Sequence, residues 1–150
     1  MRKRGFEIAK EYTAANIILP ARKTARSAGY DLAAAADIVL KSMRITLVPT
    51  GLKAYMQPDE YLGIHIRSSL ALKHGLSLIN NVGIVDSDYY ENEDNDGHIL
   101  LPVMNFGQQD FSLKAGMRIA QGIFYKYLTA DNEQQNELIQ RTGGFGSTGI

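Results

Sequence analysis

The sequence predicts an all-β fold with one short helix and a flexible C-terminal arm. In most candidate elements, apolar residues alternate with polar ones at a period of two. These segments are short and are separated by Gly, Pro, Asp and Asn, which is typical of a β-sandwich, a jelly roll or a barrel. The sequence has no internal repeat and no alternation of strands with helices, which argues against a doubly wound nucleotide-binding fold.

The alternation is clearest in residues 61–67, where Leu62, Ile64 and Ile66 would share one face of a strand. The other expected strands cover residues 5–10, 30–34, 43–47, 52–56, 76–80, 98–105, 111–113 and 119–127. The helical segment is 68–75. A serine can cap its start, and Gly75 can adopt the left-handed conformation that ends a helix.

The expected strands all lie within residues 1–128, which we assign to a single core domain. Residues 129–140 are polar and rich in Gln and Asn, which predicts a linker. Four of the 14 glycines lie in the last eight residues. Such a segment cannot build a core of its own. Residues 129–150 are therefore expected to be a linker followed by a flexible arm.

Composition excludes several functional classes. Sixteen basic residues balance sixteen acidic ones, so no overall charge attracts nucleic acid or an anionic membrane. The absence of cysteine excludes disulfides and thiolate catalysis. The basic start is interrupted by Glu7 and does not resemble a signal peptide, and no stretch has the length of a membrane span. We expect a cytoplasmic protein with neither a nucleic acid nor a membrane as partner.

The glycine-rich tail is a candidate phosphate site. Closely spaced glycines let successive N–H groups turn toward one anion. Arg141 adds a planar guanidinium and Ser147 adds a hydroxyl donor. Phe145 stands among glycines and has little to pack against unless a flat ligand lies beneath it. A disordered chain end is the alternative explanation of the same composition.

Two more sites combine polar chemistry with strand ends. Arg67, Ser68 and Ser69 open the expected helix, whose first N–H groups attract anions, although a simple serine cap explains the same residues. Asp31 lies in an apolar strand, where a carboxylate needs a partner.

Residues 80–89 form an apolar, hairpin-like segment that ends in two carboxylates beside an aromatic ring. Asp86 and Asp88 alternate along the chain, so in an extended segment they would project to opposite faces. Only one of them could then face a given site. The alternative is a turn whose aspartates bond their own backbone.

Five motifs, in this order, resemble those of the trimeric dUTPase family. They are Ala-Gly-Tyr-Asp-Leu, Arg-Ser-Ser-Leu-Ala, Gly-Ile-Val-Asp-Ser-Asp-Tyr, Gly-Met-Arg-Ile-Ala-Gln and Gly-Gly-Phe-Gly-Ser-Thr-Gly, between residues 28 and 149. The resemblance implies a jelly-roll-like β domain that forms a homotrimer with active sites shared between subunits. It also implies hydrolysis of dUTP to dUMP and pyrophosphate by water attack on the α-phosphorus, which limits uracil in DNA and supplies dUMP for dTMP synthesis.

The resemblance also implies roles for individual residues. The catalytic residues would be Asp86, which orients the attacking water, and Gln121, which holds that water or adjacent phosphate oxygens. The substrate-binding residues would be Arg67, Ser68, Ser69, Asn80, Gly83, Ile84, Tyr89, Arg141, Phe145, Gly146 and Ser147. The arm would close over the site of a neighbouring subunit. The family uses Mg²⁺, held mainly by the triphosphate, and Asp31 would bind it only through water.

Residues 91–96 depart from the family pattern, because six acidic or amide residues separate Tyr90 from Gly97. We expect a solvated surface loop, since the spacing lacks the full ligand pattern of a calcium loop. Arg141 also stands one residue closer to the double glycine than is usual in the family. Two other functions stay open: a nucleotide-gated regulatory protein that binds a partner through 91–96, and a dCTP deaminase-like enzyme of the same fold. His65, His74 and His98 are expected to be structural or exposed.

Overall fold

The structure is a computed structural model that describes residues 1–133, 138–139, 141–146. Its strands are β1 (Gly5–Ile8), β2 (Tyr30–Ala33), β3 (Ile38–Leu40), β4 (Ile45–Pro49), β5 (Leu52–Tyr55), β6 (Glu60–Ile66), β7 (Leu76–Leu78), β8 (Gly83–Asp86), β9 (Leu100–Asn105), β10 (Phe111–Leu113) and β11 (Arg118–Lys126). One α-helix, α1 (Ser68–His74), and two 3₁₀ turns, η1 (Lys10–Tyr12) and η2 (Ser87–Tyr89), complete the described elements.

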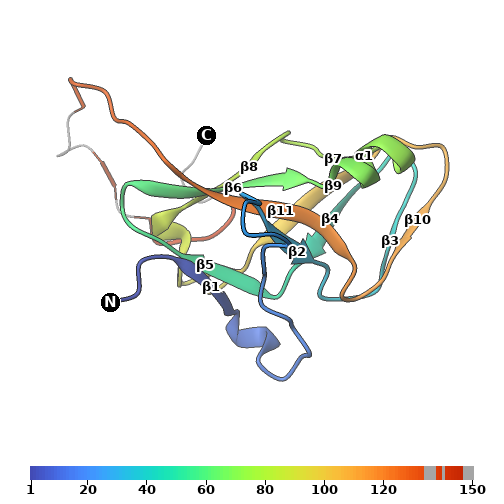
Figure 1. Cartoon of the computed structure of the whole chain (residues 1–150), viewed down its shortest axis with the longest axis horizontal. Coiled ribbons are helices and arrows are strands. Elements are labelled where there is room, and N and C mark those ends of the chain that lie inside the picture. The colour runs from blue at the N-terminus through green and yellow to red at the C-terminus, as the bar shows by residue number, and fades with distance from the viewer. Residues whose placement is uncertain (134–137, 140, 147–150) are drawn as a thin grey trace.

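The strands pair antiparallel throughout, which confirms the prediction of an antiparallel all-β domain with one short helix. A four-stranded sheet has the order β2-β11-β6-β8, and a three-stranded sheet has the order β4-β9-β7. The pairs β1-β5 and β10-β3 flank them. In Figure 1, β11 runs through the middle of the molecule, whereas α1, β3 and β10 lie at the end opposite the N-terminus. The sheets do not close into a barrel within the described part of the chain.

The core lies between the two larger sheets. Its fully buried members include Leu32, Leu40, Val48, Leu62, Ile64, Leu76, Leu78, Ile99, Leu101, Val103, Leu113 and Ile119. Leu62 and Ile64 on β6 are buried while Tyr61 and His65 are partly exposed, as the period of two predicts. Burying each such aliphatic side chain contributes about 1.5–3 kcal/mol, so packing of the two sheets fixes the positions of β6 and β8.

Helix α1 ends as expected but begins differently. Gly75 has a φ of 65°, in the left-handed region, and its N–H donates to the carbonyl of Ala71. The N-cap position is held by Arg67 in an extended conformation, with no side-chain capping hydrogen bond. The predicted serine cap is therefore wrong, because Ser68 already has helical geometry and its hydroxyl cannot reach back over the first turn.

The segment after β7 turns earlier than the sequence indicates. Strand β7 ends at Leu78, since Asn81 has a φ of 62° and its N–H donates to the carbonyl of Leu78. Asparagine tolerates this left-handed conformation better than most residues. The turn sends β8 back along β6, where Gly83 lies opposite Ile64 and Asp86 opposite Tyr61. Residues 80–86 consequently run along the edge of the core.

Residues 91–96 form a surface loop, as their composition suggests, in which Glu91, Glu93 and Asp94 are exposed, but hydrogen bonds within the loop and to neighbouring elements hold its shape. Asn92 is buried, and its Oδ1 accepts hydrogen bonds from the N–H groups of Asp94 and Asn95. Asp96 accepts hydrogen bonds from the N–H of Lys10 and from the ammonium of Lys53, which is itself buried. The acidic and amide side chains satisfy one another and neighbouring groups, because turns need such partners where the backbone leaves a regular ladder.

The three histidines have structural surroundings. His98 is buried, and its Nε2 accepts the N–H of Gly51. Burial lowers the pKa of His98, because the charged imidazolium loses its contact with water. His65 shares a hydrogen bond with the hydroxyl of Tyr125, and His74 packs against Phe111. Within the described residues, the helices are too short or too polar to cross a membrane.

Candidate active site

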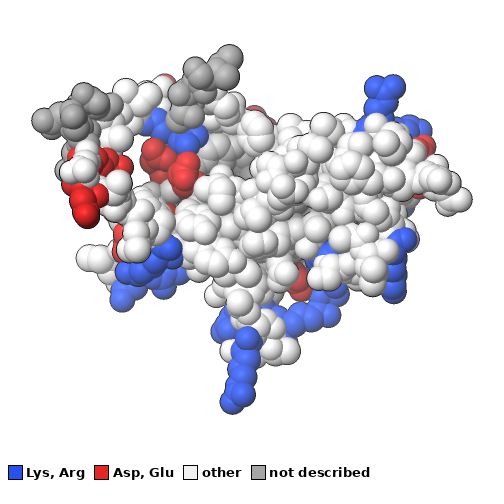
Figure 2. Space-filling model, turned by 90° about the horizontal axis from the view of Figure 1, so that it is seen from above, with Lys and Arg blue, Asp and Glu red and all other residues white. Residues whose placement is uncertain are grey.

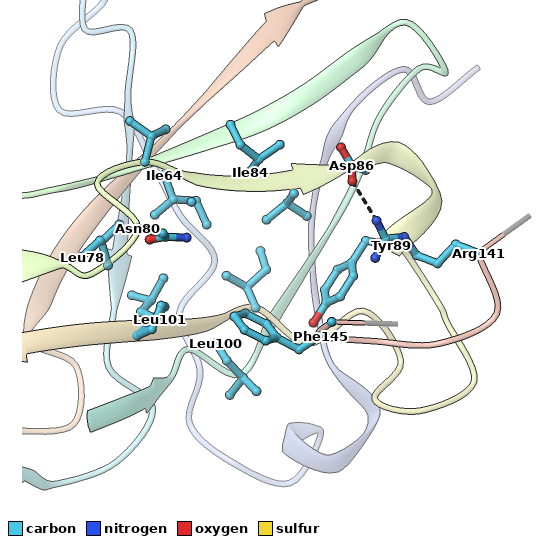
Figure 3. Close-up of a pocket in the computed structure, with 16 residues that line it drawn as sticks. Ile64, Leu78, Asn80, Ile84, Asp86, Tyr89, Leu100, Leu101, Arg141 and Phe145 are labelled. Carbon is cyan, nitrogen blue, oxygen red and sulfur yellow. Dashed lines mark hydrogen bonds and ion pairs between the residues drawn. The ribbon is translucent and has the colours of Figure 1, made fainter. Parts of the chain in front are cut away.

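A pocket of about 440 Å³ opens between β8, β9 and the C-terminal arm. Its walls are mainly apolar, and polar groups enter it at few places (Figure 3). It is lined by Ile64, Leu78, Asn80, Val82, Gly83, Ile84, Val85, Asp86, Tyr89, Ile99, Leu100, Leu101, Pro102, Arg141, Phe145 and Gly146. An apolar cleft with a few convergent polar groups is the usual form of a small-molecule site.

The turn between β7 and β8 places Asn80 in the pocket. Figure 3 shows its amide directed toward the cavity from the turn. A primary amide offers both donors and acceptors, so Asn80 can pair with a base edge that does the same. Gly83 follows on the same wall, where an added Cβ would lie 3.3 Å from the Cβ of Ile64. The absence of a side chain at this position keeps the pocket wall close to the backbone of β8.

Tyr89 forms the opposite wall of the pocket. Its ring is buried, its hydroxyl donates to the carbonyl of His98 at 2.9 Å, and the same hydroxyl accepts the amide of Asn95 at 2.8 Å. These two bonds and the burial hold the ring in one orientation, since a buried hydroxyl without partners is unfavourable. The ring therefore presents a fixed surface to any ligand in the pocket.

Asp86 and Asp88 converge at the mouth of the pocket on Arg141. The Arg141 Nη2 lies 2.8 Å from Asp86 Oδ2, and its Nε lies 3.0 Å from Asp88 Oδ1. The expectation that the two carboxylates project to opposite faces is wrong, because η2 turns the chain after Asp86 instead of extending it. Both carboxylates then face one guanidinium, a geometry that suits its forked donors.

The described part of the arm covers the pocket. Phe145 and Gly146 line the pocket, and Figure 3 shows Phe145 beside Tyr89, yet Phe145 is 66% exposed. An aromatic ring with so much exposed surface at a cavity mouth is placed to cover a flat ligand. Ser147 and the three residues that follow it lie outside the described residues.

The remaining predicted site residues gather on a different part of the molecule. Arg118 Nη1 pairs with Asp31 Oδ2 at 2.8 Å, and this pair lines a separate pocket of about 750 Å³. Arg67 is close by, because its N–H donates to the carbonyl of Ile119 and it leads into Ser68 and Ser69 of α1. Asp31 thus has the cationic partner that the sequence demands.

Gln121 belongs to this second group. It lies opposite Asp31 on β2 and opposite His65 on β6. Its side chain covers Gly29, where an added Cβ would come within 2.4 Å of Gln121 Oε1. The glycine of the first motif therefore makes room for the glutamine of the fourth.

The two groups do not meet within one chain. Asp86 lies opposite Tyr61 on β6, whereas Gln121 lies opposite His65 on the other edge of the same strand. Four residues along a strand separate them by roughly 13 Å, in addition to two strand spacings across the sheet. The structure therefore brings Asp86 to Asn80, Tyr89 and the arm, and not to Gln121.

Metal ligands are sparse in the described part of the chain, where no group of three or more His, Cys, Asp or Glu side chains is arranged to hold a metal ion. Asp31 has one carboxylate oxygen committed to Arg118. Such a residue suits contact with a metal-bound water better than direct coordination, since its charge is already shared.

Comparison with models of protein families shows to which family this chain belongs. The dUTPase family matches residues 15–149. The chain belongs to the dUTPase family. It is 48% identical over 149 residues to the deoxyuridine 5'-triphosphate nucleotidohydrolase of Lactococcus lactis subsp. lactis, across 99% of each chain. It is 41% identical to that of Rickettsia felis over 138 residues, across 88% of each chain.

Solved dUTPase structures have the same fold. The crystal structure of dUTPase from Streptococcus mutans is 48% identical and has a TM-score of 0.81, with 85% of this chain and 99% of that chain covered. A Staphylococcus bacteriophage 80alpha dUTPase with dUPNHPP has a TM-score of 0.74 over the whole of both chains at 18% identity, which shows a shared fold alone.

Sequence reasoning missed several groups that line the two pockets. The apolar floor of the pocket comes from β6 and β9, and Asp88 shares Arg141 with Asp86. Arg118, Arg22 and Lys23 line the pocket around Asp31. Arg118 belongs to a quoted motif and could have been found as the cation that Asp31 requires, whereas the floor residues carry no chemical signal.

Proposed function

We propose that this chain is a dUTP pyrophosphatase that releases dUMP and pyrophosphate by water attack on the α-phosphorus. The observation that carries the proposal is the pocket that joins Asn80, the β8 backbone and Tyr89 to the Asp86 carboxylate at its mouth, in a member of the dUTPase family. The activity would limit uracil in DNA and provide dUMP for dTMP synthesis. A cytoplasmic location stays a prediction from the sequence.

The pocket suits uracil as its ligand. The base presents a donor between two acceptors, which the amide of Asn80 and the backbone of Gly83 and Ile84 can match. A methyl group at C5 of the base would have to enter the space between β8 and the apolar wall, where the glycine already lies close to Ile64. The fixed ring of Tyr89 would exclude a 2′-hydroxyl for the same steric reason. Phe145 would then cover the base.

Asp86 would position the attacking water and accept its proton as the new bond between the water oxygen and the α-phosphorus forms and the bond to the pyrophosphate leaving group breaks. In this structure its carboxylate pairs with Arg141. A triphosphate carries more negative charge than the two aspartates and forms bidentate bonds with guanidinium, so it would compete for Arg141. Transfer of Arg141 from Asp86 to phosphate would release the carboxylate for the water and would keep the arm over the substrate.

The phosphate-binding half of the site would come from the Asp31 group of another subunit. Arg118, Arg22 and Lys23 give that pocket the positive charge that a triphosphate needs, and Gln121 and Arg67 lie beside it. Because Asp86 and Gln121 are separated on one chain, a complete site would require a second copy that brings its Gln121 to the first copy's Asp86. This argument supports a homotrimer with shared sites. In this structure the described part of the arm lies over the pocket of its own chain, and closure by the arm of a neighbouring subunit stays a prediction.

Exposed apolar surface supports the same assembly. On the outer face of β4, Ile45 is 58% and Leu47 is 48% exposed. Their cross-strand partners on β9 are Met104 and Pro102, so the face continues across two strands. In Figure 2, charged side chains lie mainly at the margin of a broad uncharged surface, on the side where Figure 1 places β7, β8 and α1. An exposed apolar face that continues across two strands is typical of a surface that is covered in an assembly.

Magnesium fits the Asp31 group as a substrate-bound ion. Asp31, held by Arg118, would contact its water shell, and the triphosphate would supply the direct ligands. When bound, Mg²⁺ supplies charge neutralisation and orientation of the phosphate oxygens. The chain's own contribution would be the placement of Asp31 on β2, opposite Gln121.

Release of pyrophosphate from dUTP tests the proposal, with dTTP, UTP and dCTP as controls. We expect turnover of dUTP and little turnover of the other three nucleotides. Equal rates with dTTP or UTP would contradict the assigned base and sugar contacts. Ammonia release from dCTP would identify a deaminase instead, and absence of any turnover would favour the regulatory alternative. The Lactococcus lactis, Rickettsia felis and Streptococcus mutans proteins compared above are named as dUTP-hydrolysing enzymes, and these names give neither alternative support.

A further inference from the structure

The C-terminal arm lies against the arm-docking loop, by which we mean residues 91–96. The Glu93 N–H donates to the carbonyl of Thr142 at 3.2 Å. The Gly144 N–H donates to Asp94 Oδ2 at 2.7 Å, a short bond to an ionisable acceptor. Gly143 and Gly144 are buried here, so the main chain of the arm itself is covered. The loop therefore binds the main chain of the arm through one donated and one accepted hydrogen bond.

The loop has its own internal structure, so it can act as a fixed surface. The Asn92 side chain accepts two N–H groups of the loop and donates to Asn95 Oδ1 at 2.8 Å. Asp96 anchors the other end of the loop to Lys53 and Lys10, from β5 and η1. A loop tied at both ends loses little conformational entropy when the arm binds.

Asn95 connects the docked arm to the pocket. Its Nδ2 donates to the hydroxyl of Tyr89, which forms the pocket wall. An added Cβ on Gly144 would lie within 3.2 to 3.3 Å of the Asn95 amide, so the arm rests directly on this residue. One side chain thus touches both the arm and the wall against which the sugar would lie.

The position of the contact along the arm gives it a function. Arg141 precedes Gly144 by three residues and reaches Asp86 and Asp88, and Phe145 follows Gly144 directly and lies at the pocket mouth. A short segment held at Gly144 can place both side chains only in a narrow range, because each is at most three residues from the anchor. The anchor therefore sets where the cation and the ring meet the substrate.

We propose that residues 91–96 are the docking surface of the C-terminal arm, with Asp94 and Asn95 as positioning residues for closure of the arm over the pocket. Docking itself is a property of the described chain. Its effect on turnover rests on the proposed hydrolysis of dUTP. The chain at this point departs from the family pattern, so the device is specific to chains that carry such a loop.

Limited proteolysis tests docking without any substrate. Trypsin cleaves after arginine, and the Arg141 side chain is only 13% exposed when the arm is docked. In Asp94→Ala, we expect cleavage after Arg141 to be about tenfold faster, since one charge-assisted hydrogen bond is lost. Mass spectrometry of the shortened chain measures this cleavage. Asp94→Asn keeps an acceptor oxygen and should stay within about threefold of the unaltered protein.

Kinetics with dUTP test positioning. In Asp94→Ala the KM should rise about tenfold while kcat changes less than about twofold. In this variant the arm would be undocked most of the time, so binding of substrate has to supply the free energy that closes it, whereas saturating substrate still closes it. Glu93→Ala is the matched control: it removes a carboxylate from the same loop and leaves the main-chain bond to Thr142 in place. It should change neither cleavage nor KM.

Unchanged cleavage and KM in Asp94→Ala would overturn the proposal, and so would equal acceleration of cleavage in Glu93→Ala. Gly144→Ala approaches the same contact from the arm, where its methyl group would press on Asn95, and should also speed cleavage even if the loop variants fold poorly. If the unaltered protein failed to hydrolyse dUTP, the proposed function would fall while the cleavage experiment still decided whether the arm docks.

Discussion

At the scale of single residues, Arg141 lies between two aspartates that would otherwise repel each other and the substrate. Asp86 and Asp88 are about half exposed, and Arg141 is nearly buried between them and the ring of Tyr89. A triphosphate approaching the uncovered carboxylates would meet like charge. The guanidinium therefore makes the pocket mouth acceptable to an anion before the substrate arrives.

Asp86→Asn tests the catalytic assignment. Asparagine keeps the shape and an acceptor for Arg141 but cannot take a proton from water. We expect the rate of pyrophosphate release to fall about a hundredfold or more, with dUTP affinity changed only a few fold. Single-turnover assays and equilibrium binding measure the two quantities. Near-normal turnover would mean that another group activates the water.

His98 should make the stability of the fold depend on pH. Its Nε2 accepts the Gly51 N–H, and burial lowers its pKa below the ordinary 6.5, with Glu11 opposing part of the effect. The unfolded chain thus binds a proton at a pH where the folded chain does not. The His98 contribution is complete above pH 6.5 and is lost as pH falls from there toward the lowered pKa.

His98→Gln retains an acceptor without a titrating group. Between about pH 7.5 and about pH 5, its free energy of unfolding should therefore fall less than that of the unaltered protein. Urea unfolding at both pH values measures the difference. Equal losses in the two proteins would show that protonation of His98 does not couple to folding.

At the scale of elements, the turn η2 and the arm-docking loop decide the geometry of the site. The 3₁₀ turn brings Asp88 to the side of Asp86, and the loop directs the arm to the pocket. Neither belongs to the core sheets, yet hydrogen bonds fix both of them. The hydroxyl of Tyr89 in η2 donates to the carbonyl of His98, and the ammonium of Lys53 on β5 donates to Asp96 in the loop. Function at this pocket therefore depends on short irregular elements that rigid strands hold in place.

A chain that ends at residue 140 tests the arm as an element. It loses Arg141 and Phe145, so kcat/KM for dUTP should fall about tenfold or more. The free energy of unfolding should change by less than about 1 kcal/mol, since the lost ion pairs involve aspartates that are about half exposed. Steady-state kinetics and urea unfolding provide the two values. Full activity in the shortened chain would make closure irrelevant to catalysis.

At the scale of the whole molecule, the separation of Asp86 from Gln121 is the dominant fact. No bending of a packed sheet brings them together, because β6 lies between them and is fixed by Leu62 and Ile64 in the core. The exposed apolar face of β4 and β9 offers a surface for the second copy that a complete site would need.

Leu47→Glu places a charge on that face. We expect a folded chain of monomer mass with little dUTP turnover, because each site would lose residues from its neighbour. Light scattering coupled to size exclusion measures the mass, and activity should partly return at high protein concentration. Gln108→Glu adds the same charge at an exposed position outside β4 and β9 and is the control. Full activity in a monomeric Leu47→Glu protein would place the complete site within one chain.

Much of the fold and of the site chemistry was visible in the sequence. Alternation at Leu62 and Ile64 predicted β6, and Gly75 predicted the end of α1, since both signals are local. Strand β3 was missed although the equally short β10 was predicted. Its pairing with β10 links residues 71 positions apart, Leu40 and Phe111, and no local pattern reports such a pairing. The serine cap failed for a similar reason: cap geometry depends on how the preceding strand enters the helix.

By itself, the sequence determined the antiparallel β class, the helix end and the motifs that place this chain among the dUTPases. These depend on side-chain period, on glycine conformation and on chemistry within a few residues. The tertiary structure decided that Asp86 and Asp88 share Arg141, that residues 91–96 hold the arm, and that Gln121 lies away from Asp86. The physical reason is that these relations concern residues far apart in the chain, as in the bond between Gly144 and Asp94, which are 50 positions apart. Packing of the complete chain, and no local pattern, sets such distances.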